Sequence, residues 1–172
     1  MAISKKIIKY LDKVGYKYEV IEHKTTYTAW DTAQTAQKHQ LKKKIKTEEI
    51  AKALILRVDN NYVLALIPAN KKLDKKKFLR VYNTDQKKQK FKTAKKITLA
   101  KEVWMKKNMP GKVGATPPFR EVLKLGIYMD NLLARQKNIY AGSGEYEYSI
   151  KVPIKQFLKI EQPAKGVFSA KM

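Results

Sequence analysis

Positions 51–68 read AKALILRVDNNYVLALIP, two apolar runs separated by Asp59, Asn60 and Asn61. Asp and Asn tolerate the positive φ angles of a tight turn, so the pattern predicts a β-hairpin with strands at Ala51–Val58 and Tyr62–Pro68. Both runs are almost continuously apolar, which is typical of strands that are covered on both faces. We therefore expect other elements to pack on each face of this hairpin.

Weaker patterns outside the hairpin predict further helices and strands. Ser4 can cap a helix that ends at Gly15, and Asp74 lies near the start of a helix at Leu73–Tyr82. The other predicted helices are Thr28–Lys38, Ala100–Lys107 and Pro153–Leu158, and the other predicted strands are Tyr16–Ile21, Ile97–Leu99, Ile127–Met129, Asn138–Ala141 and Tyr146–Val152.

The order of these elements predicts the fold class. Strands outnumber helices and most connections are short, which favours a single α+β domain with a mixed, largely antiparallel sheet flanked by helices. We expect this domain to occupy residues 1–160. Residues 161–172 lack periodicity and are expected to form a C-terminal tail.

Composition excludes several classes of protein. The chain has 172 residues and no cysteine, which excludes disulfide scaffolds, Cys-ligated zinc and thiol catalysis. The longest apolar run, Tyr62–Ala69, is far shorter than the ~20 residues of a membrane span. The segment Met1–Tyr10 is not followed by the apolar stretch of a signal peptide. We therefore expect a soluble, cytoplasmic protein.

The charge balance is strongly basic. There are 38 Lys and Arg against 15 Asp and Glu, a formal net charge of +23. Such an excess favours a polyanionic partner, because each phosphate that a cation neutralises releases condensed counterions. Only four of the cations are arginines, and the lysine runs are spread along the chain. The alternative is therefore that the lysines only solvate the surface.

Several familiar chemistries do not fit the motifs. His23 and His39 have no metal-ligating neighbours at a suitable spacing, so we expect no metal site. Gly111–Gly114 lacks the glycine and the hydroxyl residue of a phosphate-binding Walker loop. Ala141–Gly144 lacks the outer glycine of a nucleophile elbow. Asp74 and Asp130 have no nearby carboxylate partner of the kind that glycosidases use.

Three local features can carry chemistry. Lys52 interrupts the start of an apolar strand, where it either reaches the edge of the sheet or projects into a cleft to meet an anion. The loop Gly114–Phe119 combines a flexible glycine with two prolines, and is either a plain surface turn or a presenter of backbone N–H groups. The small residues at Tyr140–Gly144 allow either a bulge or the close approach of a ligand.

Seven short motifs follow one another in a distinctive order. They are Glu22-His23, Ile50–Leu56, Tyr62–Asn70, Lys72-Leu73-Asp74, Gly114–Phe119, Tyr128-Met129-Asp130 and Ala141-Gly142-Ser143. In this order and spacing, from about residue 4 to residue 160, the chain resembles the YbaK/ProX family. That family comprises trans-acting aminoacyl-tRNA editing domains related to the insertion domain of bacterial prolyl-tRNA synthetase.

The resemblance implies a compact α/β domain that hydrolyses the ester between a wrong amino acid and the 3′ end of tRNA. It implies no metal, no other cofactor and no covalent nucleophile. Its partners would be mischarged tRNA and, in some cases, an aminoacyl-tRNA synthetase. Carried over from the family, Lys52 would engage the terminal adenosine or its phosphate, and the backbone amides of Gly114, Ala115 and Thr116 would polarise the acyl carbonyl.

The resemblance also assigns substrate-binding residues. Gly142 and Ser143 match the small-residue turn of the family, but Gly144 stands where many relatives have His. Asn70 stands where many relatives have Asp, and either departure would alter amino-acid preference. Separately, we expect the size of a pocket lined by Tyr27, Leu66 or Pro118 to set specificity. The substrate-binding candidates are therefore Tyr27, Asn70, Pro118, Gly142 and Ser143.

A lone lysine and a Gly/Pro loop, without a matching histidine or carboxylate pair, suggest a mechanism. Water would attack the ester with help from the neighbouring ribose hydroxyl of the substrate, and backbone N–H groups would stabilise the oxyanion. Lys52 would orient the terminal nucleotide rather than transfer a proton. Two alternatives stay open: a non-catalytic RNA-binding module of the same fold, and a regulatory domain that binds a small molecule or a protein.

Overall fold

The computed structural model describes residues 3–23 and 45–172, and the expected helix at Thr28–Lys38 lies outside this part. In the described part, the helices are α1 (Lys5–Val14), the 3₁₀ turn η1 (Thr47–Glu49), α3 (Lys75–Lys88), α4 (Glu102–Asn108), α5 (Arg120–Leu123), α6 (Asn131–Ala134) and α7 (Ile154–Glu161). The strands are β1 (Glu19–Glu22), β2 (Ala51–Val58), β3 (Asn61–Pro68), β4 (Lys71–Leu73), β5 (Ile97–Leu99), β6 (Gly126–Asp130), β7 (Asn138–Gly142), β8 (Tyr148–Pro153), β9 (Ala164–Gly166) and β10 (Ser169–Lys171).

The β2–β3 hairpin confirms the pattern that the sequence predicts. Val58 pairs with Asn61, so the strands are joined by two residues and β3 begins one position earlier than expected. Asp59 has a φ of 52° at the turn, a conformation that Asp adopts more readily than most residues. The polar residues at 59–60 therefore close a tight antiparallel pair.

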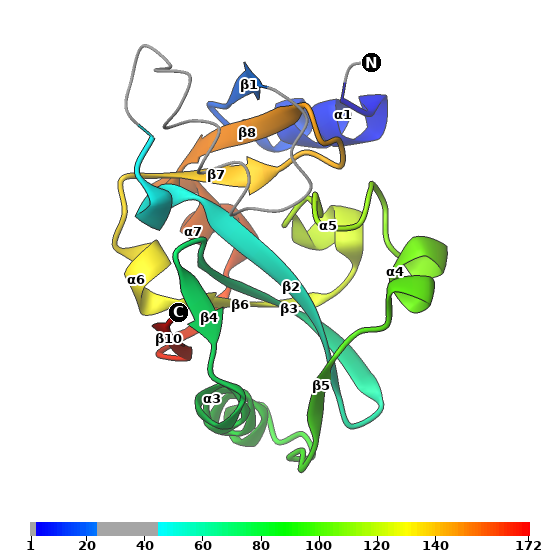
Figure 1. The fold of residues 1–172 in the computed structure, drawn as a ribbon, viewed down its shortest axis with the longest axis vertical. Coiled ribbons are helices and arrows are strands. Elements are labelled where there is room, and N and C mark those ends of the chain that lie inside the picture. Colours follow the sequence, from blue (N-terminus) through cyan, green and yellow to red (C-terminus); the bar gives the residue numbers. More distant parts are fainter. Residues whose placement is uncertain (1–2, 24–44) are drawn as a thin grey trace.

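Both faces of the hairpin are covered, as its continuous apolar runs predict. One face packs in a core that includes residues of α1, α7 and β8 together with Phe119, and its own contribution is Ala51, Ile55, Leu64 and Leu66. The other face packs against Phe78 and Tyr82 of α3, and its own contribution is Leu56, Val58, Val63, Ala65 and Ile67. Figure 1 shows the hairpin running between α3 at one end of the molecule and α1 with β8 at the other.

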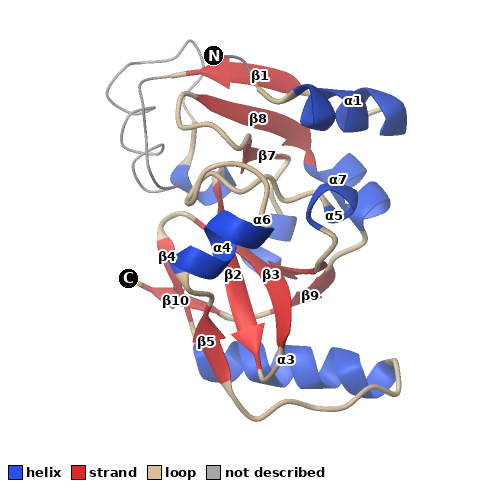
Figure 2. Ribbon diagram, turned by 90° about the vertical axis from the view of Figure 1, so that its right-hand side faces the viewer, coloured by secondary structure: helices blue, strands red, loops and turns tan. Residues whose placement is uncertain are grey.

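The strands form three sheets rather than the single sheet expected. The largest has the order β5-β2-β3-β6-β9, a second has the order β1-β8-β7, and β4 pairs with β10. Strand β6 runs parallel to both β3 and β9, whereas the other pairings are antiparallel. The fold class, a mixed sheet flanked by helices, is confirmed. Figure 2 shows the β1-β8-β7 sheet stacked at the end opposite α3.

Several element boundaries differ from the sequence prediction, among them the start of β1 and the end of α3. Tyr16 is buried and its N–H donates to the carbonyl of Leu11 at 3.0 Å, so it completes the turn after α1 and β1 begins only at Glu19. Helix α3 continues to Lys88, six residues beyond the predicted end. Its last turns carry polar side chains, so the apolar periodicity that marks the helix stops before the helix does.

The C-terminal residues are part of the fold, which corrects the expected tail. Residues 164–166 pair with β6 and residues 169–171 pair with β4. Phe168 is fully buried, and the carboxylate of Asp130 accepts hydrogen bonds from the N–H groups of Phe168 and Ser169 at 2.8 and 2.9 Å. Three-residue strands are too short to produce a visible periodicity, so the sequence pattern missed them.

Candidate active site

Lys52 lies near the start of β2, on the face of the hairpin that also carries Leu54 and Leu56. Its side chain is partly buried, and its ammonium group donates to the carbonyl oxygen of Lys71 in β4 at 2.7 Å. An ammonium group has three N–H donors, so this bond leaves two for a ligand. The structure thus places the lysine beside the turn that leads from β3 to α3.

The electrostatic setting of Lys52 favours an anionic ligand. Burial lowers the pKa of its ammonium group, because the charged form loses hydration. In the described residues, no carboxylate forms an ion pair with it. A partly desolvated cation without a counterion attracts a phosphate or the negative end of a dipole.

Asn70 lies in the same turn, immediately before the residue that binds Lys52. Its amide oxygen is buried and has no hydrogen-bond partner. A buried acceptor without a donor is uncommon in native proteins and has an energetic cost. The structure therefore brings the predicted substrate-binding Asn70 into the neighbourhood of Lys52.

The loop Gly114–Phe119 is held against the core. Gly114 is exposed and has a φ of 91°, whereas Ala115 and Thr116 are buried. The N–H of Ala115 donates to the carbonyl of Lys112 at 3.0 Å. Ala115 therefore has no free N–H for a substrate, contrary to the expected role. Within the described residues, the N–H groups of Gly114 and Thr116 have no such backbone partner.

Gly142, at the end of β7, touches the same loop. A Cβ atom at this position would lie 2.7 Å from the carbonyl oxygen of Ala115 and still closer to that of Thr116. The N–H of Gly144 donates to the carbonyl of Ala115 at 2.7 Å. Two of the motifs that the sequence singled out are thus in backbone contact, and only a glycine fits between them.

The backbone conformation at position 144 favours glycine. Its φ is 89°, in the left-handed region that side chains with a Cβ rarely adopt. Gly111 approaches it so closely that a Cβ on Gly111 would lie 2.5 Å from the Cα of Gly144. A histidine at position 144, as in many YbaK/ProX sequences, would therefore be strained in this backbone.

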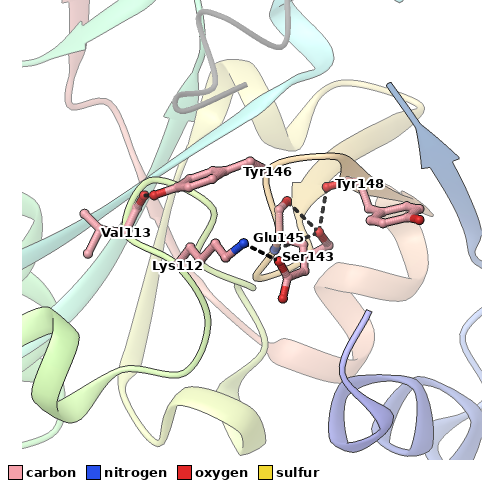
Figure 3. A network of polar contacts seen from close by, with 6 residues as sticks. All are labelled: Lys112, Val113, Ser143, Glu145, Tyr146 and Tyr148. Carbon is pink, nitrogen blue, oxygen red and sulfur yellow. Dashed lines mark hydrogen bonds and ion pairs between the residues drawn. The ribbon is translucent and has the colours of Figure 1, made fainter. Parts of the chain in front are cut away.

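Ser143 is fully buried, and its hydroxyl is used within its own turn. It donates to the carbonyl of Tyr148 at 2.6 Å and accepts from the N–H of Glu145 at 3.2 Å. Figure 3 shows these bonds closing the turn between β7 and β8. The hydroxyl is thus turned toward its own backbone, which gives Ser143 a role in shaping the turn.

Three further contacts clamp the β7–β8 turn to the loop that precedes Gly114. The ammonium group of Lys112 pairs with the Glu145 carboxylate at 2.9 Å and lies 5.4 Å from the ring centroid of Tyr146. The hydroxyl of Tyr146 donates to the carbonyl of Val113 at 2.7 Å (Figure 3). No local sequence pattern predicts these contacts, because the residues they join lie more than thirty positions apart.

The far end of the loop is anchored by a buried carboxylate. Glu161 of α7 accepts from the backbone N–H of Arg120 at 2.6 Å, and from the hydroxyls of Tyr10 and Tyr16 at 2.6 and 2.7 Å. Burial and the neighbouring carboxylate raise the pKa of both tyrosines far above their ordinary value, so both hydroxyls stay protonated and donate. This anchor fixes where the loop re-enters the core.

Strand β2 brings Lys52 toward the two contacting motifs. Ile50 forms an isolated parallel bridge with Tyr140 of β7, and Lys52 and Gly142 each lie two positions beyond it. Within the described residues, no further ladder pairing between β2 and β7 continues from this bridge. Backbone groups that are not paired in a ladder are where a ligand can approach.

The remaining predicted residues are placed as follows. Tyr27 and His39 lie outside the described residues. Leu66 is fully buried in the core and Pro118 is buried as well, so neither presents side-chain surface to a ligand here.

Among residues 3–23 and 45–172, no cluster of three or more His, Asp or Glu could hold a metal ion. In the same ranges, no helix is both long and apolar enough to cross a membrane.

Comparison with known proteins gives consistent results. The sequence model of a family described as aminoacyl-tRNA editing domain matches residues 23–160. A search of curated proteins finds no match.

Solved structures share the whole fold. A protein described as a candidate trans-editing enzyme for prolyl-tRNA synthetase superposes with a TM-score of 0.77 at 18% identity, covering 98% of this chain and 99% of that one. A protein described only as hypothetical gives a TM-score of 0.76 at 17% identity, covering 96% of this chain and 100% of that one. At these identities the likeness establishes the fold alone.

Proposed function

Because the chain belongs to the family of aminoacyl-tRNA editing domains, we propose that it hydrolyses the ester bond of mischarged tRNA in trans. The observation that carries the proposal is the contact of Gly142 with Ala115 and Thr116, beside the strand that holds Lys52. This arrangement offers a cation for the tRNA end and a rigid stretch of backbone for the acyl group.

In the proposed reaction, a water oxygen adds to the carbonyl carbon of the ester. The N–H groups of Gly114 and Thr116 stabilise the oxyanion, since the Ala115 N–H is already used. One such donor, preorganised, is worth about 2.7–4 kcal/mol. The bond to the ribose oxygen then breaks, that oxygen takes a proton that comes from the water, and the amino acid leaves with a free carboxyl group.

The neighbouring ribose hydroxyl of the substrate directs the attacking water. This assignment is supported by the Ser143 hydroxyl, which is bonded to its own turn. The two remaining N–H donors of Lys52 bind the terminal phosphate or the adenosine and hold the ester against the loop. The lysine thus acts through orientation, which can contribute a large part of a rate enhancement.

The test is deacylation of a panel of mischarged tRNAs by the purified protein, scored by the amino acid released. Lys52→Ala is expected to lower kcat/KM by about 100-fold, the scale on which lost positioning acts. Lys155→Ala, which removes an exposed lysine of α7, is the matched control and is expected to be silent. Undiminished hydrolysis by Lys52→Ala would remove that residue from the mechanism.

The same panel separates the proposal from its main alternative. An RNA-binding module without catalytic function would bind tRNA in a salt-sensitive way and release no amino acid from any member of the panel. That result would overturn the proposed hydrolysis.

A further inference from the structure

Positive charge is concentrated in one part of the fold. Residues 71–96, which comprise β4, α3 and the segment that follows it, contain twelve Lys and Arg against two Asp, a net charge of +10 out of +23 for the chain. Lys76, Arg80 and Lys87 lie four and eleven positions apart and therefore share one face of α3. All three are exposed, whereas Phe78 and Tyr82 face the core.

Helix α3 begins beside the candidate active site and leads away from it. Lys52 binds the carbonyl of Lys71, and Asp74 caps α3 three residues later by accepting from the N–H of Lys77 at 3.0 Å. Fourteen helical residues extend for about 21 Å. In Figures 1 and 2 the helix lies at the end of the molecule opposite α1 and β1. A polyanion held at Lys52 could therefore continue along the lysine face of α3.

The far end of α3 carries an unusual aromatic residue. The N–H of Phe91 donates to the carbonyl of Gln86 at 2.8 Å and that of Lys90 to the carbonyl of Lys87 at 3.1 Å, the bonds of a Schellman motif. Lys90 has a φ of 61°, where glycine is usual. The apolar residue after such a cap normally packs back on its helix, yet Phe91 is 60% exposed.

Phe91 borders a hollow of about 450 Å³ between the end of α3 and the start of β6. Its wall is rich in side-chain amides and aromatic rings, including Asn61, Tyr62, Gln86, Gln89 and Gln162. The one carboxylate on the wall, that of Asp85, is engaged by the Tyr128 hydroxyl at 2.7 Å and by the Gln89 amide at 2.9 Å. A second hollow of about 280 Å³, lined by Arg80, Lys88 and Lys165, adjoins it through Asp85 and Ala164.

We propose that α3 and the segment after it form an RNA-binding surface, in which the lysine face holds backbone phosphates and Phe91 stacks on an unpaired base. Lysines around an exposed aromatic ring are the combination that binds single-stranded or frayed nucleic acid without reading its sequence. Amide groups in the adjacent hollow suit the polar edges of a base. The inference rests on the proposed function only in taking the RNA to be the body of the tRNA substrate.

The first test measures the affinity of the whole protein for uncharged tRNA as a function of salt concentration. The variant Lys76→Ala, Arg80→Ala, Lys87→Ala removes three exposed cations of α3, and alanine preserves the helix. The control variant Lys5→Ala, Lys6→Ala, Lys9→Ala removes three exposed cations of α1. We expect the α3 variant to bind more weakly and to lower the slope of log K against log salt by about 2–3, with the control close to wild type.

The second test concerns Phe91. Phe91→Ala is expected to weaken tRNA binding by roughly fivefold or more, whereas Phe91→Trp, which keeps a stacking surface, is expected to retain it. Because Phe91 is largely exposed, both variants are expected to melt near the wild-type temperature.

Three results would overturn the inference: equal effects of the α3 and α1 variants, unchanged binding by Phe91→Ala, or binding to phosphatidylserine vesicles that tRNA does not compete away. Uncharged tRNA carries no ester, so this measurement is independent of the hydrolysis assay. A protein that binds tRNA through α3 but releases no amino acid from any mischarged tRNA would keep this inference and lose the proposed function.

Discussion

The close approach of Gly142 to the 114–119 loop gives a quantitative prediction. Ordinary contact to a Cβ begins near 3.4 Å, but a Cβ at position 142 would lie 2.7 Å from the Ala115 carbonyl oxygen and closer still to that of Thr116. The substitution Gly142→Ala must therefore push the loop away by at least 0.7 Å at Ala115, and by about 1 Å overall. Both obstacles are backbone atoms, so no side-chain rotation can relieve the clash.

The expected result is a folded protein with a damaged site. Overpacking of this kind typically costs about 1–3 kcal/mol, which a domain stable by about 5–15 kcal/mol can tolerate. A displacement of about 1 Å in groups that position a substrate lowers the rate by roughly 100-fold. We therefore expect Gly142→Ala to melt cooperatively, at a reduced temperature, and to lose most of its kcat/KM on mischarged tRNA.

Gly126→Ala is the matched control, since a Cβ there would meet nothing closer than 3.9 Å. It lies in a strand, where alanine loses less backbone entropy than glycine, so we expect unchanged hydrolysis and equal or slightly higher stability. Full deacylation activity in a folded Gly142→Ala protein would refute the reasoning, because it would show that the position of the loop does not matter to the reaction.

Two further predictions concern stability. Glu161→Gln leaves too few acceptors for the Arg120 N–H and two tyrosine hydroxyls, so urea denaturation should show that the free energy of unfolding falls by about 2–5 kcal/mol. The control Glu121→Gln changes an exposed carboxylate and should lower the free energy of unfolding by less than about 1 kcal/mol. Backbone N–H groups of the segment after α3 lower the pKa of the Asp59 carboxyl in the folded protein. The ionised carboxyl therefore stabilises the fold fully above the pKa of about 3.9 that it has in the unfolded chain, and this stabilisation is lost as the pH falls through the lower pKa of the folded state. The Tm advantage of wild type over Asp59→Asn, present at about pH 6, should therefore shrink below about pH 4; an advantage that is constant with pH would contradict this.

The hairpin shows which features could be predicted from sequence. Its apolar runs and its Asp-Asn turn give both the strand pairing and the burial of both faces, because burial and backbone preference act within a few residues. The positions of Asp74 as a helix cap and of Lys52 near the start of a buried strand follow from the same local rules.

The expected role of Ala115 shows where such reasoning fails. A Gly/Pro loop indicates that backbone N–H groups can be presented, but it does not indicate which ones are already bonded. The bond from the Ala115 N–H to Lys112 depends on the path of the loop, which its contacts with the turn at 142–144 fix. For a related reason, the sequence does not indicate that Leu66 is fully buried in the core.

The sequence by itself determined most of the local elements and the alternation of buried and exposed positions. Only the tertiary structure decided that the loop at 114–116 touches Gly142, that Lys112 pairs with Glu145, and that residues 164–171 complete two sheets. The physical reason is that the hydrophobic periodicity of a helix or strand indicates only which of its own faces is buried and which is exposed. Contacts between loops depend on how whole elements are placed relative to each other, and short irregular segments carry no periodic trace of that placement.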